Sequence, residues 1–231
     1  VPNGDAMMLP YWPDNDGDGL GDGLGDGGAP TDVAGYYPFN QNTDDMSGND
    51  HHGNPRDVGY AEDRFGNANS AVYLDDRYDG IDIPAFNSNQ ITASAWYKHN
   101  NHNDYGALFA EDNTSHYHIM MHNNDFGFYS SGWYDSGHNL TVGDWYHVVF
   151  TMDGAHRKIY LNNVKVYDTS VSGKTNSTSP LGYIGNSGWN RDHGTEGSID
   201  DVRIYNRVLA TEEISELYLG GNFTEYCDAD A

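Results

Sequence analysis

Positive charge and cysteine are both scarce in this sequence. Its 231 residues include 11 Lys and Arg against 35 Asp and Glu, which gives a formal net charge of −24. Nucleic acids and anionic membranes are bound through basic side chains that displace counterions, so this composition argues against both as partners. Cys227 is the only cysteine, and a disulfide within the chain is therefore impossible.

Long apolar runs are also missing. No stretch approaches the roughly 18 apolar residues that cross a bilayer, so we expect no membrane insertion. The first residues, from Val1 to Asp5, lack the basic and apolar regions of a signal peptide, and we expect a mature or excised product. An acidic chain of this size with one cysteine fits bacterial secretion, which predicts an extracellular or cell-surface location.

Aromatic and turn-forming residues are abundant instead. Aromatic residues make up 13% of the chain, which supports a genuine core although only 37% of the residues are hydrophobic. From Val33 onward, short apolar runs alternate with turn residues, a pattern that predicts a sandwich or barrel of short strands. The predicted strands are 33–39, 71–74, 91–98, 107–110, 116–121, 126–129, 145–151, 157–161, 164–167, 182–185 and 198–206.

Two local patterns predict structure in detail. Asn162 and Asn163 separate two apolar runs, which predicts a hairpin with a two-residue turn. Thr211 as N-cap, two glutamates in the first turn and apolar residues at helical spacing from Ile214 predict one short C-terminal helix that ends at Gly220.

Five segments follow one another in a recognisable order along the chain. They are Tyr36 to Phe39 with Asp45 to Asn49, Arg64 to Asp75, Ile91 to Lys98, Val142 to Gly154, and Gly197 to Arg207. Together they resemble the laminin-G-like family of the concanavalin A-like lectin and glucanase superfamily, over roughly residues 33–219. The resemblance implies an all-β fold, an antiparallel two-sheet β-sandwich (jelly roll) whose first and last strands are adjacent. Members bind glycans, adhere, or accompany polysaccharide-degrading enzymes, and the fold alone does not choose among these roles.

The chain divides into three predicted regions. Residues 1–30 form an Asp/Gly-rich calcium-binding segment or linker, residues 31–221 the laminin-G-like β-sandwich, and residues 222–231 a C-terminal tail. In the first region, alternate carboxylates on a Gly-relieved loop can converge on a hard cation such as Ca²⁺. The pattern D-x-D-x-D-G-x-G-D is similar to a thrombospondin type 3 calcium repeat. The predicted ligands are Asp14, Asp16, Asp18, Asp22 and Asp26.

The resemblance implies a second calcium site. Members of the family often hold a structural calcium near the corner where the first loop meets the last strand. Asp45 and Asn49 would then supply ligands from the loop, and Asp200 or Asp201 from the strand. In the alternative interpretation, Asp45 and Asn49 make only the turn hydrogen bonds that Asx residues commonly form.

Histidines and loop aromatics are the candidate sugar-binding residues. His116, His118 and His122 share one face of a predicted strand, where they could contact a sugar, chelate zinc or serve the structure alone. Trp133 and Trp189 lie in Gly/Asn/Ser-rich stretches, where a ring either stacks on a sugar or folds back as a loop anchor. The predicted carbohydrate-binding residues are Trp133, Tyr134, Trp189, Asn190, Arg191, His116 and His118.

Catalytic motifs are not recognisable. Glycoside hydrolysis needs a pair of carboxyl groups, and the glutamates do not form the alternating strand motif of this superfamily's enzymes. Nucleophile elbows, phosphate-binding loops and dinucleotide fingerprints are also missing. We therefore predict a non-catalytic, lectin-like module that binds calcium and glycans or polysaccharides. The alternatives are a structural or adhesive domain that contacts neighbouring surface-protein domains, and a polysaccharide hydrolase or lyase with an unrecognised site.

Overall fold

Strands dominate the part of the chain that the computed structural model describes, which is residues 32–100, 105–111, 117–129, 132–154, 156–170, 181–187 and 193–220. Within these residues one helix, α1 (Thr211–Gly220), follows the last strand, so the predicted all-β fold with a short C-terminal helix is confirmed. The strands are β1 (Gly35–Tyr37), β2 (Asn54–Arg56), β3 (Gly59–Ala61), β4 (Ala71–Leu74), β5 (Gly80–Phe86), β6 (Gln90–His99), β7 (Tyr105–Glu111), β8 (Tyr117–His122), β9 (Asp125–Tyr129), β10 (Trp133–Asn139), β11 (Trp145–Asp153), β12 (His156–Leu161), β13 (Val164–Ser170), β14 (Leu181–Ile184) and β15 (Gly197–Tyr205).

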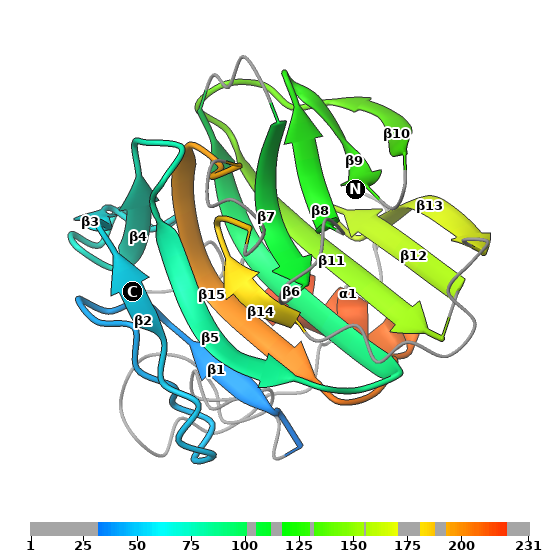
Figure 1. The fold of residues 1–231 in the computed structure, drawn as a ribbon, viewed down its shortest axis with the longest axis horizontal. Coiled ribbons are helices and arrows are strands. Elements are labelled where there is room, and N and C mark those ends of the chain that lie inside the picture. The colour runs from blue at the N-terminus through cyan, green and yellow to red at the C-terminus, as the bar shows by residue number, and fades with distance from the viewer. Residues whose placement is uncertain are drawn as a thin grey trace, which may run out of the picture.

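The strands form two antiparallel sheets that pack face to face (Figure 1). The eight-stranded sheet has the order β13-β12-β11-β6-β15-β4-β3, with β1 beside β15. The seven-stranded sheet has the order β10-β9-β8-β7-β14-β5-β2. The first and last strands, β1 and β15, are adjacent as the resemblance implied, and the architecture is a jelly-roll β-sandwich.

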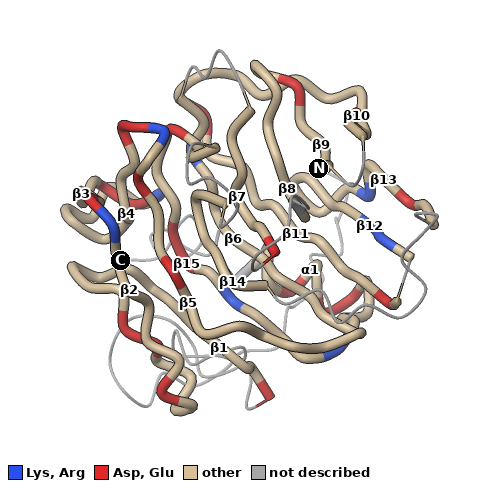
Figure 2. The backbone as a smooth tube through the Cα atoms, viewed as in Figure 1, with Lys and Arg blue, Asp and Glu red and all other residues tan. Residues whose placement is uncertain are grey.

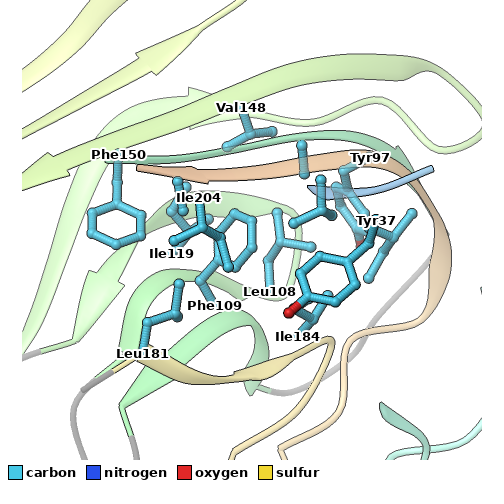
Figure 3. Packing of buried hydrophobic residues seen from close by; sticks show 14 of the residues in the cluster. Tyr37, Tyr97, Leu108, Phe109, Ile119, Val148, Phe150, Leu181, Ile184 and Ile204 are labelled. Atoms are coloured by element: carbon cyan, nitrogen blue, oxygen red, sulfur yellow. The ribbon is translucent and has the colours of Figure 1, made fainter. Parts of the chain in front are cut away.

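The hydrophobic core lies between the two sheets because each strand turns alternate side chains inward. On β6, for example, Ala93, Ala95 and Tyr97 face the core. Full burial of one large apolar side chain contributes about 1.5–3 kcal/mol, so this layer is the main source of stability. Figure 3 shows part of it, including Tyr37, Tyr97, Leu108, Phe109, Ile119, Val148, Phe150, Leu181, Ile184 and Ile204.

Helix α1 covers part of the outer face of the eight-stranded sheet. Its first turn is capped by Glu213, which accepts a hydrogen bond of 2.8 Å from the backbone N–H of Ala210 and pairs with Arg207 at 2.6 Å. Ala210 also accepts the first helical hydrogen bond, so the N-cap is Ala210 and the prediction of Thr211 was wrong by one residue. The buried cluster under the helix comprises Val33, Tyr36, Val149, Tyr160, Tyr205, Leu209 and Ile214.

Each of the predicted strands overlaps a strand of the structure, and four further strands are new. Asn162 and Asn163 have φ angles of 48° and 64°, which confirms the two-residue turn between β12 and β13. The sequence analysis does not predict β2, β3, β5 or β10. Strand β5 contains Pro84, and β10 is mostly polar, so neither has the apolar alternation that identifies a strand.

Two further expectations concern membrane insertion and the two ends of the chain. Among the described residues, no helix is both long enough and apolar enough to span a bilayer. The predicted regions 1–30 and 222–231 lie outside the described residues.

Candidate functional site

The outer face of the seven-stranded sheet carries the candidate site. Directly paired residues of antiparallel strands point to the same side of a sheet, so the register fixes which side chains share this face. Ala107 and Met120 identify it, because they pack in a small cluster separate from the core between the sheets. Three rows cross this face: Tyr105, His122 and Asp125; Ala107, Met120, Gly127 and Asp135; and Asp82, Tyr183 and Ala110.

Four rings, those of Tyr105, His122, Trp133 and His193, gather on this face, and we name them the aromatic patch. Tyr105 and His122 stack in parallel, with ring centroids 4.1 Å apart and an interplanar angle of 6°. Trp133 stands across this stack, 6.4 Å from Tyr105 at 70° and 5.8 Å from His122 at 75°. His193 lies 6.4 Å from Tyr105 on the remaining side. All four side chains are partly exposed, so their rings are accessible to a ligand.

A glycine makes room for the tryptophan. A Cβ atom at Gly127 would lie 2.9 Å from Cη2 of Trp133 and 2.1 Å from the backbone oxygen of Tyr134. Separations below 3.0 Å are not tolerated by real Cβ atoms, so only glycine lets β10 and the indole lie this close to β9. The position of Trp133 in the patch therefore depends on Gly127.

The structure separates the two aromatic residues that the sequence analysis placed together. Trp133 and Tyr134 are neighbours on strand β10, rather than on a loop, and so point to opposite faces. Trp133 packs with Tyr105 on the outer face. Tyr134 packs against the core, where it stacks on Phe128 at 4.5 Å and 2°. The prediction that the two rings share one site therefore does not fit this geometry.

His118 is buried between the sheets, although the alternation of β8 predicts that it shares a face with His122. The pairing of β8 with β9 shifts register between Tyr117 and Met120, and this irregularity turns His118 inward. Its ring stacks on Phe150 at 4.4 Å, and it lies 3.9 Å from the carboxylate of Glu111. It is 1% exposed, so the predicted sugar contact at His118 does not fit a surface site.

The other predicted sugar-binding residues cannot be placed. They lie outside the described residues and are His116, Trp189, Asn190 and Arg191.

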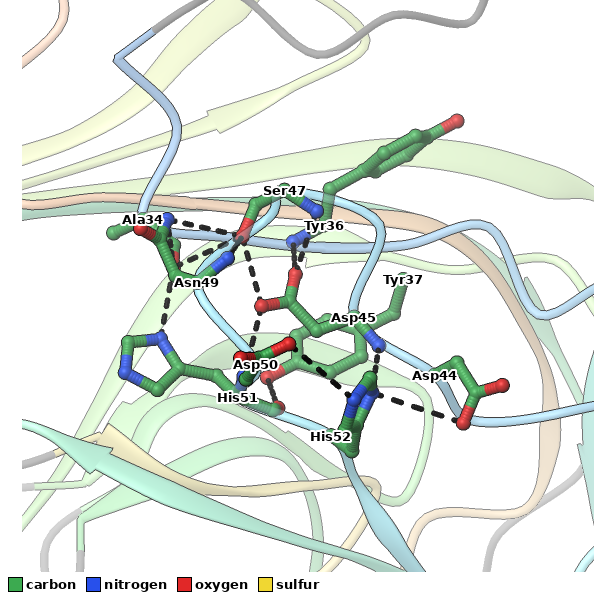
Figure 4. Close-up of polar contacts among 10 residues, drawn as sticks. All are labelled: Ala34, Tyr36, Tyr37, Asp44, Asp45, Ser47, Asn49, Asp50, His51 and His52. Atoms are coloured by element: carbon green, nitrogen blue, oxygen red, sulfur yellow. Dashed lines mark hydrogen bonds and ion pairs between the residues drawn. The ribbon is translucent and has the colours of Figure 1, made fainter.

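The loop after β1 is organised around the carboxylate of Asp45 (Figure 4). Its Oδ1 accepts hydrogen bonds from the backbone N–H groups of Tyr36 and Ser47, at 2.8 and 2.9 Å. Its Oδ2 accepts from the Ser47 hydroxyl at 2.8 Å and from the His51 backbone at 3.0 Å. Burial alone would raise the pKa of the Asp45 carboxyl, but these four hydrogen bonds lower it below its ordinary value. Asn49 donates its amide to the carbonyl of Ala34 at 3.2 Å.

Asp200 and Asp201 belong to a different network, on the outer face of the eight-stranded sheet. Arg64 pairs with both carboxylates, and Arg203 lies 2.6 Å from Asp201. Burial alone would raise the pKa of Asp201, but the charges of Arg203 and Arg64 lower it below its ordinary value. Arg64 also lies over the ring of Trp96, 4.9 Å from its centroid. The two carboxylates are therefore partners of arginines.

The predicted calcium site in the sandwich does not fit these contacts. A carboxylate has about four acceptor positions, and all four of Asp45 accept hydrogen bonds from β1 and the loop. Across the described ranges, no three His, Cys, Asp or Glu side chains are grouped to hold a metal ion, so Asp45, Asp200 and Asp201 do not form one site. The alternative interpretation, in which Asp45 and Asn49 make turn hydrogen bonds, fits the structure. The residues predicted to bind calcium in the N-terminal segment, Asp14, Asp16, Asp18, Asp22 and Asp26, lie outside the described residues.

Comparisons with solved structures show the fold. The chain is similar to domain 4 of AbnA, an extracellular arabinanase from Geobacillus stearothermophilus solved in complex with arabinotriose. The TM-score is 0.67 at 24% identity, over 80% of this chain and 98% of that one. It is also similar to Trypanosoma rangeli sialidase, with a TM-score of 0.64 at 14% identity, over 85% of this chain and 34% of that one. This chain therefore spans about a third of the sialidase.

Comparison with protein families gives the relationship directly. The search of curated proteins found no match. The family model described as the concanavalin A-like lectin/glucanases superfamily matches residues 67–215, which is more than half of the 231 residues. The chain belongs to the concanavalin A-like lectin/glucanases superfamily.

Proposed function

We propose that this chain is a non-catalytic carbohydrate-binding domain, and that the aromatic patch is where it holds a glycan. The observation that carries the proposal is the grouping of Tyr105, His122, Trp133 and His193, all partly exposed, on one outer sheet face. The exposed part of these rings contributes nothing to the buried apolar area, but it offers the flat apolar surface on which the C–H face of a sugar stacks.

Polar groups beside the patch complete the arrangement that a specific site needs. Asp125 shares a row with Tyr105 and His122, and Asp135 shares one with Gly127. Carboxylate oxygens accept hydrogen bonds from sugar hydroxyls and fix their orientation. The likeness to AbnA domain 4, which was solved with arabinotriose, supports a sugar as the ligand.

The absence of catalysis is part of the proposal. Hydrolysis of a glycosidic bond normally needs two carboxyl groups about 5–9.5 Å apart, one of them with a raised pKa. Glu111, the only glutamate in the strands of the seven-stranded sheet, is buried beside Arg157 at 3.4 Å between the sheets, and so cannot reach a glycan on the outer face. We expect no release of reducing sugar when the protein is incubated with the polysaccharides that it binds. Release that is lost on substituting Asp125 or Asp135 would contradict the proposal.

Affinity electrophoresis tests the site. The native protein is run through gels that contain arabinan, xylan, β-glucan or glycol chitin, and the polysaccharide that retards it is identified. We expect Trp133→Ala and Tyr105→Ala each to weaken retention at least about tenfold, because each removes a ring on which the sugar stacks. Tyr78→Ala is the matched control, since Tyr78 is 58% exposed and lies outside the patch. Equal retention of the patch variants and the control would refute the proposed site.

Calcium binding by the N-terminal aspartates and an extracellular location remain parts of the proposal. The support is the spacing of Asp14, Asp16, Asp18 and Asp22, together with the net charge of −24, whose self-repulsion a bound cation would reduce. A site held at about 100 times its Kd stabilises the folded chain by about 2.7 kcal/mol, so we expect EDTA to lower the melting temperature by several degrees. EDTA preloaded with calcium is the control. An unchanged melting temperature, or the same loss in an Asp14→Asn/Asp16→Asn variant, would contradict calcium binding at this segment.

A further inference from the structure

The sheet that carries the aromatic patch is nearly free of basic residues. Six of its strands, β5, β7, β8, β9, β10 and β14, contain no Lys or Arg (Figure 2). The remaining strand, β2, contributes Arg56, whose Nε lies 2.9 Å from Oδ1 of Asp82. The basic side chain on the strands of this sheet is therefore already paired. It belongs to the edge strand β2, whereas β10 forms the other edge.

Acidic side chains lie beside the rings. Asp125 pairs in register with His122, whose ring stacks on Tyr105, and it points to the same face because its neighbour Phe126 is in the core. Asp125 is partly exposed, and among the residues that the structure describes its carboxylate has no ion-pair partner. Asp135 is exposed and pairs in register with Gly127, over which Trp133 lies.

Aromatic faces and carboxylates attract the same kind of group. The face of Tyr or Trp attracts a cation through its quadrupole, and a carboxylate attracts it through its charge. An anionic sugar brought to this face would meet Asp125 and Asp135 without a neighbouring Lys or Arg on β7, β8, β9 or β10 to offset the repulsion. The net charge of −24 favours the approach of cationic ligands and opposes that of anionic ones.

We propose that the aromatic patch binds glycans that carry protonated amines more tightly than their neutral counterparts, and neutral glycans more tightly than glycans that carry carboxylates. This inference rests on the proposed function and specifies its ligand class. Asp125 is the residue that sets the preference, because it lies next to the Tyr105–His122 stack and its carboxylate has no ion-pair partner in the described part of the chain.

Three polymers with one backbone test the order of preference. Glycol chitosan carries amines, glycol chitin carries the neutral N-acetyl groups, and carboxymethyl chitin carries carboxylates. Affinity electrophoresis at about 0.15 M salt, where the screening length is about 8 Å, limits attraction between distant charges. We expect retention to fall in the order glycol chitosan, glycol chitin, carboxymethyl chitin. Equal retention by the first two, or stronger retention by the third, would overturn the inference.

Variants separate the site from the overall charge of the protein. Asp125→Asn should weaken binding to glycol chitosan about two- to fivefold more than it weakens binding to glycol chitin, which is the range of an exposed ion pair. Asp153→Asn removes the same charge from the end of β11 in the other sheet and should change neither. An equal effect of the two variants would assign the preference to net charge and overturn the inference.

Trp133→Ala distinguishes the proposed glycan site from the proposed charge preference, because it removes a ring and keeps every charge. We expect it to reduce retention by glycol chitosan and glycol chitin together. If it weakens binding to a neutral polysaccharide but leaves glycol chitosan retention intact, the proposed function stands and the charge preference is wrong. If it changes retention by no polysaccharide, the proposed function itself is wrong.

Discussion

The two sheets differ in what their outer faces present to solvent. On the eight-stranded sheet, α1 covers part of the face, and the buried charges of Arg203 and Asp201 are paired at 2.6 Å. On the seven-stranded sheet, the rings of Tyr105 and Trp133 are partly exposed, and Asp125 has no ion-pair partner among the described residues. The first face therefore contributes to stability, and the second is available to a ligand.

The difference between the two outer faces predicts which mutations affect stability and which affect glycan binding. Changes on the covered face should lower the free energy of unfolding and leave glycan binding by the folded protein intact. Changes on the exposed face should weaken binding and affect folding less.

Arg203→Ala should have the largest effect on stability. It leaves the buried carboxylate of Asp201 without its closest partner, and breaking a buried ion pair in this way costs about 3–5 kcal/mol. Lys165→Ala is the matched control, because Lys165 pairs with Asp168 at an exposed position where a salt bridge contributes about 0–1 kcal/mol. Urea unfolding measures both. If the two variants lose similar amounts of unfolding free energy, the ion pair on the covered face contributes no more to stability than an exposed one.

Gly127→Ala should lower the free energy of unfolding and also weaken glycan binding, because Gly127 lies where the aromatic patch packs onto the sheet. The added Cβ would meet the backbone oxygen of Tyr134 at 2.1 Å, so β10 must move away from β9. Overpacking of this kind costs up to about 3 kcal/mol, and the displaced Trp133 should no longer support retention. Gly132→Ala is the control, since a Cβ there has no heavy atom within 4 Å. A stable Gly127→Ala variant that binds normally would contradict the geometry of the patch.

His147 should make the covered face sensitive to acid. Burial lowers its pKa from 6.5 to about 3 in the folded chain. Between these values the unfolded chain takes up a proton and the folded chain does not, so stability is lost as the pH falls below 6.5. His147→Phe keeps a ring beside Trp96, 5.2 Å away in the native protein, and removes the titration.

Thermal or urea unfolding at about pH 7 and about pH 4.5 measures this effect. The native protein should lose about 2 kcal/mol more than His147→Phe over this range, since each unit of pKa difference corresponds to about 1.4 kcal/mol. Contributions of other groups are shared by both proteins and cancel in the difference. An identical loss in the two proteins would show that His147 does not carry the effect.

The sequence predicts the scaffold well, because alternation and turn chemistry are local properties. The run from Ile91 to Ala95 alternates apolar and polar residues, and it forms part of β6 with Ala93 and Ala95 in the core. The turn at Asn162 and Asn163 needs two residues that tolerate positive φ, and the structure has them there. Strand β10 escapes prediction because its partner β9 and Gly127, not apolar alternation, determine its position.

The candidate site is only partly predictable, because it depends on which strands become neighbours. Trp133 is identified from sequence, but for a loop rather than a strand. Tyr105 and His193 join it from elements far apart in the chain, and no local pattern connects them. His122 is on the face that alternation gives it, whereas an irregularity in β8 turns His118 into the core. Such register shifts cannot be read from residue types alone.

Amide chemical-shift mapping shows directly whether the outer face of the seven-stranded sheet is the glycan site. The labelled protein is titrated with oligosaccharides of the polysaccharide that retards it most strongly in the gels. We expect the largest shifts at the Trp133 indole N–H and along β7, β8, β9 and β10, with little change in α1 and β15. Shifts concentrated in α1, β15 or the Asp45 loop, with Trp133 unchanged, would contradict this placement of the site.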